Sequence, residues 1–140
     1  GQIVLLDFGA TRLYSRDSTE AFRRLLVAGW RDDRAAINEA ALEVGYFQHE
    51  TLAKHRLLLT DLICQACEPL RHQGAYDFAI SDLAGRLRDA GWQLGADRDF
   101  WHTPPVAVLF LHRKVAGLYM LAAKLKARVD VRRLFEPYVM

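Results

Sequence analysis

Residues 104–129 of the chain read PPVAVLFLHRKVAGLYMLAAKLKARV and carry its most regular apolar pattern. Apolar residues recur there at alternating spacings of four and three, which is typical of one buried face of a long α-helix. Thr103 and Pro104 favour a helix start, because the hydroxyl can cap the helix and proline costs nothing at the first helical position. The predicted buried stripe consists of Val108, Leu111, Val115, Leu118, Ala122, Leu125 and Val129.

Basic side chains lie opposite this stripe. Arg113, Lys114, Lys124 and Arg128 fall within an arc of roughly 100° on the other side of the helix. A solvent-exposed basic face is the simplest interpretation, and contact with phosphate or with the headgroups of an anionic membrane is the functional alternative. The apolar runs on either side of residues 112–114 are each shorter than the roughly 20 residues that span a bilayer, so no transmembrane helix is expected.

Helical periodicity continues through most of the remaining chain. The spacing predicts helices that start near Asp17 and end near Trp30, that start at Asp32 or Asp33 and stop at Gly45, and that cover about 50–70, 78–90 (with Gly91 as the stop) and 130–136. The one confident strand signal is Ile3–Leu6, a short apolar run with β-branched members. The predicted fold is therefore mostly α, with one short N-terminal strand.

Composition excludes several classes of protein. The 140 residues, 51% apolar and 26% charged, are typical of one globular domain. The net charge of +2 is too small to indicate a nucleic-acid partner. Two cysteines cannot form a disulfide framework, which favours a reducing compartment over secretion. Cys64 and Cys67 form a Cys-x-x-Cys pair, but they lie deep in an apolar helix and are interpreted as two small buried hydrophobes.

The strand signal leads into the sharpest motif of the chain, Leu5-Leu6-Asp7-Phe8-Gly9-Ala10-Thr11-Arg12. A carboxylate at a strand end, followed by a flexible glycine, is how kinase-like enzymes hold the magnesium ion that bridges nucleotide phosphates. Taken by itself, the string Asp-Phe-Gly is equally typical of a strand followed by a tight turn.

A wider pattern gives the motif more weight. Together with residues 110–119 (FLHRKVAGLY) and 124–129 (KLKARV), it closely resembles the UbiB/AarF family of atypical protein-kinase-like (ADCK-type) proteins. The resemblance covers essentially the whole chain but only the C-terminal part of that family's kinase-like domain. It implies the helical C-lobe of a protein-kinase-like fold, from a family that binds ATP or ADP with magnesium and supports ubiquinone biosynthesis.

The resemblance also implies roles for single residues. Asp7 matches the family's metal-binding aspartate, and Phe8 and Gly9 complete the nucleotide-site motif. The string His112-Arg113-Lys114 has a lysine where the kinase catalytic loop has aspartate, so no catalytic residue is expected in this chain. The family's N-lobe, its Lys-x-Gly-Gln motif and its catalytic loop are expected upstream of residue 1, which fits a chain that starts at Gly1 in mid-strand.

These expectations define two functional hypotheses. In the first, the chain is part of an ATP-dependent atypical kinase or ATPase, inactive and without tight nucleotide or Mg²⁺ binding until it joins its N-lobe. In the second, it is a non-catalytic helical module that binds a protein or a membrane surface. Under both hypotheses the protein is expected in the cytoplasm or peripheral to a membrane. An exposed edge of the strand Ile3–Leu6, or an exposed apolar surface, would favour homo-oligomers.

Overall fold

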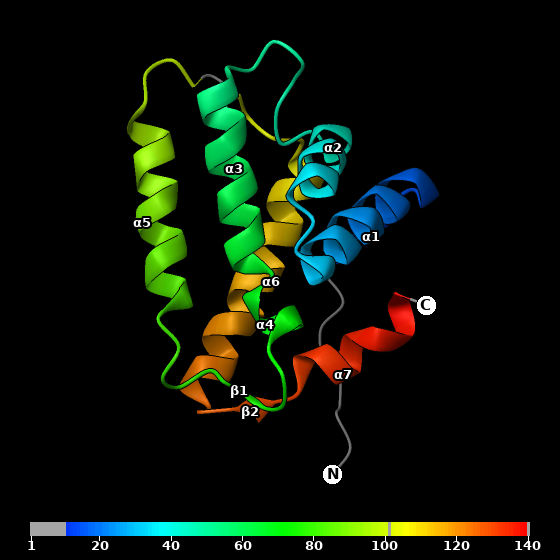
Figure 1. Cartoon of the computed structure of the whole chain (residues 1–140), viewed down its shortest axis with the longest axis vertical. Coiled ribbons are helices and arrows are strands. Elements are labelled where there is room, and N and C mark those ends of the chain that lie inside the picture. The colour runs from blue at the N-terminus through cyan, green and yellow to red at the C-terminus, as the bar shows by residue number, and fades with distance from the viewer. Residues whose placement is uncertain (1–10, 101, 140) are drawn as a thin grey trace.

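Helices make up most of the described part of the chain, residues 11–100 and 102–139 of a computed structural model (Figure 1). The mostly α prediction is confirmed, whereas the predicted strand Ile3–Leu6 lies outside the described residues. The elements in chain order are α1 (Arg16–Arg31), α2 (Arg34–Val44), α3 (Ala53–Ala66), α4 (Glu68–Arg71), β1 (Tyr76–Asp77), α5 (Leu83–Ala96), α6 (Val106–Lys124), β2 (Arg128–Val129), α7 (Val131–Phe135) and the 3-10 helix η1 (Glu136–Tyr138).

Helices α1 and α2 form a closely packed pair with well-defined ends. Ser15 caps α1 by accepting a hydrogen bond from the backbone N–H of Ser18, so the helix begins slightly before the predicted start at Asp17. Asp33 caps α2 in the predicted way, by accepting from the N–H of Ala36 at 3.0 Å. Gly45 ends α2 with φ of 91°, a left-handed conformation that glycine adopts without steric cost.

The predicted helix over 50–70 is two helices. It breaks at Cys67 because Pro69 has no N–H to bond to the carbonyl one turn earlier, so the backbone ladder of α3 cannot continue. The break lets Arg71 of α4 fold back across the helix ends. Its guanidinium donates to the carbonyl oxygens of Gly29 at 2.8 Å and Cys64 at 2.9 Å, which ties α4 to both α1 and α3.

Two further boundaries differ from the prediction. The fourth helix begins at Leu83 and not at 78, because Tyr76–Asp77 form a strand that pairs antiparallel with Arg128–Val129. It also continues through Gly91, the predicted stop, to Ala96. The long helix ends at Lys124, since Lys126 takes a left-handed φ of 52° that turns the chain into β2. Strands of two residues contain no repeat of the period-2 pattern, so the sequence carries no signal for them.

The main core lies where α1, α2 and α3 meet. Helix α3 packs on α2 and also on α5, the neighbour beside it in Figure 1. Phe47 and Ile37, at 1% and 0% exposure, are the largest side chains that are fully buried there. The core comprises Ala21, Leu25, Ala28, Ile37, Ala40, Ala41, Val44, Tyr46, Phe47, Leu59, Ile63, Cys64, Cys67, Leu94 and Val108.

Asp97 links the end of α5 to the start of α3. Its carboxylate accepts hydrogen bonds from Lys54 Nζ at 2.8 Å and from Nε2 of the buried His55 at 2.9 Å. The Lys54 ammonium, followed by His55 and the backbone N–H of Asp99, lowers the pKa of Asp97 below its ordinary value. The charged carboxylate therefore stabilises the fold fully above the unfolded-state pKa of about 3.9, and this contribution is lost as the pH falls through the lower folded-state pKa.

This linkage predicts a pH-dependent effect of Asp97→Asn. The measurement is urea unfolding of wild type and variant between about pH 3 and pH 6. The difference in their free energies of unfolding should be largest near pH 6. It should shrink below about pH 4, where Asp97 begins to be protonated in the unfolded chain. Asp89→Asn is the matched control, because Asp89 is exposed and pairs with its neighbour Arg88. A difference between wild type and Asp97→Asn that stays constant across this range would contradict the linkage.

Candidate functional site

The predicted nucleotide and metal residues Asp7, Phe8 and Gly9 lie outside the described residues. The first residues that the structure describes are Thr11 and Arg12, the last two positions of the Asp-Phe-Gly-Ala-Thr-Arg motif. The structure describes the residues that follow the Asp-Phe-Gly string, from Thr11 onward, and the helix α6 that they contact.

Residues 11–15 lie against the N-terminal half of α6. The Arg12 guanidinium carbon is 5.0 Å from the centre of the Phe110 ring, and the Tyr14 hydroxyl donates to the carbonyl oxygen of Ala107 at 3.3 Å. Leu13, between them, is 94% exposed. Ala107 and Phe110, three apart, share a face of α6. Residues 12–14 therefore contact this face of α6 at two points, one through Arg12 and one through Tyr14.

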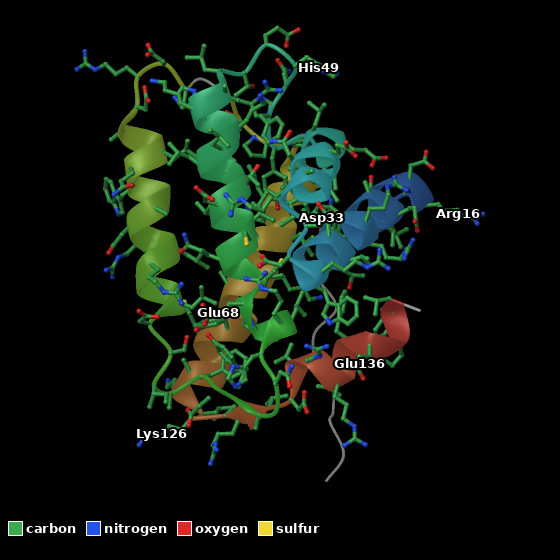
Figure 2. All side chains as sticks on the ribbon, in the orientation of Figure 1. Arg16, Asp33, His49, Glu68, Lys126 and Glu136 are labelled. Atoms are coloured by element: carbon green, nitrogen blue, oxygen red, sulfur yellow. The ribbon has the colours of Figure 1, made fainter. Side chains whose placement is uncertain are left out.

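The four basic residues singled out from the sequence are all exposed, but the structure does not bring them together on one helix. Arg113, Lys114 and Lys124 belong to α6. Arg128 lies in β2, beyond the turn at Lys126, and its Nε is 3.5 Å from a carboxylate oxygen of Asp77. Figure 2 shows this turn at the end of the molecule opposite His49.

The apolar stripe predicted to be buried is buried only at one end. Val108 is 2% exposed, whereas Val115, Leu118 and Leu125 are 58%, 60% and 68% exposed. The prediction of a continuous buried face is therefore wrong for the described residues, because no described element packs closely along α6. Apolar side chains also point away from the core on the same helix, among them Val106, Leu109, Phe110, Met120 and Leu121.

The length of α6 bears on whether the helix could cross a membrane. The two apolar runs form one continuous helix of 19 residues, which is long and apolar enough to cross a membrane by length and composition alone. Each apolar run by itself is still shorter than a bilayer span, as predicted, and the charged residues between the runs lie within the helix. Arg113 and Lys114 lie near the middle of the helix, where each charge would cost about 2.5 to 3.5 kcal/mol in the hydrocarbon core. Crossing a bilayer would therefore place two charges of this helix in the hydrocarbon core.

Two tyrosines hold the inner side of α6. Tyr46, buried after α2, has its pKa raised by burial, so its hydroxyl stays protonated, and it is hydrogen-bonded to Nε2 of His112. The two rings also stack with centres 5.2 Å apart. Near the other end of α6, the Tyr119 hydroxyl lies 2.6 Å from the Ser81 hydroxyl. The string His112-Arg113-Lys114 thus lies within a helix, as predicted, and not in a catalytic loop.

The Tyr119 contact belongs to a chain of hydrogen bonds that ends at the carboxylate of Glu68. This carboxylate decides which hydroxyl donates and which accepts at each step. Glu68 accepts from the Tyr76 hydroxyl at 2.8 Å, and a carboxylate can only accept. Ser81 must then donate to Tyr76 at 2.6 Å, and Tyr119 must donate to Ser81. Burial is the main cause that raises the pKa of Tyr76. This chain joins α4, β1 and α6, and no residue pattern in the sequence pointed to it.

The Cys-x-x-Cys pair is structural. Cys64 and Cys67 are free and buried, and the Cys64 thiol donates to a carboxylate oxygen of Asp32 at 3.0 Å. Burial raises the pKa of Cys67 to about 11 and also raises that of Cys64. Because the reactive form of cysteine is the thiolate, these thiols are poor nucleophiles at neutral pH. The interpretation as two small buried hydrophobes is confirmed.

Comparison with known proteins places the chain among kinase-like proteins. It is 31% identical over 135 residues to the atypical kinase coq-8, mitochondrial, of Caenorhabditis elegans, 29% identical over 138 residues to the atypical kinase COQ8, mitochondrial, of Saccharomyces cerevisiae, and 26% identical over 135 residues to the atypical kinase COQ8B, mitochondrial, of Rattus norvegicus. Each match covers 96% of the chain. The chain is homologous to a segment of the UbiB-type atypical kinases.

The UbiB-type relatives are much longer than the chain. The chain spans 18% of the nematode protein, 27% of the yeast protein and 25% of the rat protein. No protein-family model matches the chain. The relatives named atypical kinases thus confirm the resemblance to the UbiB family that the sequence showed.

Proposed function

We propose that the chain is the C-terminal part of the kinase-like domain of an ATP-dependent atypical kinase or ATPase that supports ubiquinone biosynthesis. The match along 96% of the chain to proteins named atypical kinases carries this proposal. The Asp-Phe-Gly string at residues 7–9 supports it, because the string occupies the start of the matching chain and is followed by a segment fixed on α6.

In this proposal Asp7 holds the magnesium ion, and Phe8 and Gly9 shape the backbone around it. A carboxylate is the hard oxygen ligand that Mg²⁺ prefers. Residues 11–100 and 102–139 contain no group of three or more His, Cys, Asp or Glu side chains that could hold a metal. When bound with ATP or ADP, the ion would neutralise charge on the phosphates.

The proposal requires the complete protein for activity. Phosphoryl transfer depends on positioning by the nucleotide-binding lobe, the catalytic loop and the metal together. The isolated 140 residues should therefore turn over no ATP above a contaminant control, while the complete protein should do so in the presence of Mg²⁺. Turnover by the isolated chain at the rate of the complete protein would refute this division of roles.

A second candidate function, docking on an anionic membrane surface, rests on a specific observation. Apolar side chains such as Phe110 and Leu121 are half exposed on α6, and the exposed cations Arg113, Lys114 and Lys124 lie among them. This combination is typical of helices that lie in a membrane interface.

Charge reversal on α6 tests this candidate. Arg113, Lys114 and Lys124 changed together to Glu should weaken co-sedimentation with vesicles that contain anionic lipid by about a hundredfold, since each cation contributes about 1 kcal/mol. The matched control changes the exposed Arg16, Arg31 and Arg98 to Glu, with the same change in net charge. Equal losses in the two variants, or no preference of the complete protein for anionic over neutral vesicles, would remove membrane docking by α6.

A further inference from the structure

Gly117 lies at the centre of the exposed side of α6. Four residues one turn away share that side of the helix and are also exposed: Arg113, Lys114, Met120 and Leu121. A Cβ atom added at Gly117 would meet nothing within 4 Å. Glycine inside a helix lowers its stability relative to alanine. No contact within the described residues therefore explains glycine here, whereas the close approach of another segment to the helix backbone would require it.

Apolar side chains lie on both sides of Arg113 around the helix. At about 100° per residue, Leu109 and Met120 lie to one side of it, and Phe110 and Leu121 lie to the other. These four side chains are between 42% and 68% exposed. Apolar residues around most of a helix are typical of a position inside a larger protein. A membrane surface would cover one side of such a helix, whereas protein segments can cover it from several directions.

The three cations of α6 have no carboxylate partner among the residues that the structure describes. Arg113, Lys114 and Lys124 form no ion pair there, whereas Arg128, beyond the end of the helix, lies 3.5 Å from Asp77. A charged side chain that is covered by protein needs an opposite charge, because burying an unpaired charge is unfavourable. A segment that covers α6 would therefore carry carboxylates that face these cations.

We propose that a segment from the remainder of the complete protein crosses α6 at Gly117, covers its exposed apolar side chains and pairs carboxylates with Arg113 and Lys114. This inference rests on the proposed function, in which the chain is one part of a longer kinase-like protein. The chain spans between 18% and 27% of the relatives named above, so most of each relative lies outside the matching segment. The occupant is thus a segment of the same polypeptide, apolar where it meets Phe110 and Leu121 and acidic beside the cations.

Replacing glycine by alanine in the complete protein gives a test in which the sign decides. A Cβ atom at Gly117 would push the crossing segment away from α6, so Gly117→Ala should lower the melting temperature by about 2 °C or more. On a free helix the same change should raise it, because alanine has the better helix propensity. Gly91→Ala in α5 is the matched control and should raise it, since Gly91 is also exposed and an added Cβ atom meets nothing within 4 Å. A rise in Gly117→Ala equal to that in Gly91→Ala would overturn the proposal.

The ion pairs have a test of their own. Arg113→Gln in the complete protein should lower the melting temperature by about 4 °C or more, because it leaves a carboxylate of the crossing segment buried without its partner. Arg98→Gln removes an exposed cation from the turn after α5 and should leave the melting temperature unchanged. Equal effects of the two substitutions would refute the ion pair at Arg113.

Thiol labelling reports on the cover without a change at the crossing point. In the complete protein, the thiol of Leu121→Cys should react with a maleimide at least about tenfold more slowly in the folded state than in urea, since reaction requires local opening. Mass spectrometry of the peptide that contains residue 121 separates this label from labels on other cysteines. Equal rates in the two states would overturn the proposal. Protection that appears only with vesicles of anionic lipid, or that is lost on dilution, would also overturn it and assign this side of α6 to a membrane or to a second copy.

These outcomes are independent of the test of Asp7. If Asp7→Asn abolishes turnover while Leu121→Cys labels freely, the proposed function stands and the crossing segment is refuted. If turnover survives in Asp7→Asn while Leu121→Cys is protected and Gly117→Ala lowers the melting temperature, the assignment of Asp7 fails and the crossing segment stands.

Discussion

Replacing Gly29 by alanine is expected to lower the free energy of unfolding by about 2 kcal/mol. A Cβ atom at Gly29 would lie 2.3 Å from Cys67 Sγ and 2.8 Å from Cys67 Cβ. The thiol could rotate away, but Cys67 Cβ is fixed by the backbone at the break between α3 and α4. The resulting overpacking costs up to about 3 kcal/mol, and the better helix propensity of alanine offsets about 1 kcal/mol.

Replacing a glycine by alanine at Gly91 should have the opposite effect on the free energy of unfolding. Gly91 lies inside α5, and a Cβ atom added there would meet no other atom within 4 Å, so Gly91→Ala should raise the free energy of unfolding by up to about 1 kcal/mol. Combining Gly29→Ala with Cys67→Ala should recover part of the loss, because the Sγ contact is removed while the Cβ contact stays.

Chemical unfolding of Gly29→Ala, Gly91→Ala, Cys67→Ala and the double variant measures these effects. Gly29→Ala should shift the denaturation midpoint down and Gly91→Ala should shift it up, with a favourable coupling energy between positions 29 and 67 in the double-mutant cycle. Stabilisation by Gly29→Ala comparable to that of Gly91→Ala would mean that α1 does not pack against Cys67 in this way.

The sequence predicted helices well where a local feature defines their ends. Asp33 and Gly45 bound α2 as predicted, because capping and left-handed termination depend on residues within one turn. The start of α5 and the end of α6 could not be predicted, because they depend on pairing between Tyr76–Asp77 and Arg128–Val129, about fifty residues apart in the chain. Tertiary pairing overrode the helical propensity of residues 78–82 and 125–129.

Around the candidate site, too, the sequence predicted properties that depend on local spacing but not contacts between distant segments. The basic residues of α6 and the side of the helix that they share were found from the sequence, since helical spacing fixes which residues share a face. The exposure of Val115, Leu118 and Leu125 could not be found, because the apolar pattern of a helix shows which faces are suited to burial but not whether a neighbour covers them. Tyr14 and Ala107 are 93 residues apart, and no local pattern relates them.

Asp7→Asn is expected to have the largest effect on activity. The substitution keeps the shape of the side chain and removes the charge that would hold Mg²⁺ against the phosphates, so ATP turnover should fall by at least about a hundredfold. Asp17→Asn is the matched control, because Asp17 is an exposed carboxylate in the first turn of α1. Thermal unfolding of both variants should match wild type, which separates a lost ligand from a lost fold.

The measurement that tests the central claim most directly is therefore Mg²⁺-dependent ATP turnover of the complete protein with Asp7 and with Asp7→Asn, at equal folded concentration. The proposed function predicts turnover that depends on Mg²⁺ in the wild type and in Asp17→Asn, and that is lost in Asp7→Asn. Equal Mg²⁺-dependent turnover in all three proteins would contradict the assignment of Asp7 as the metal ligand.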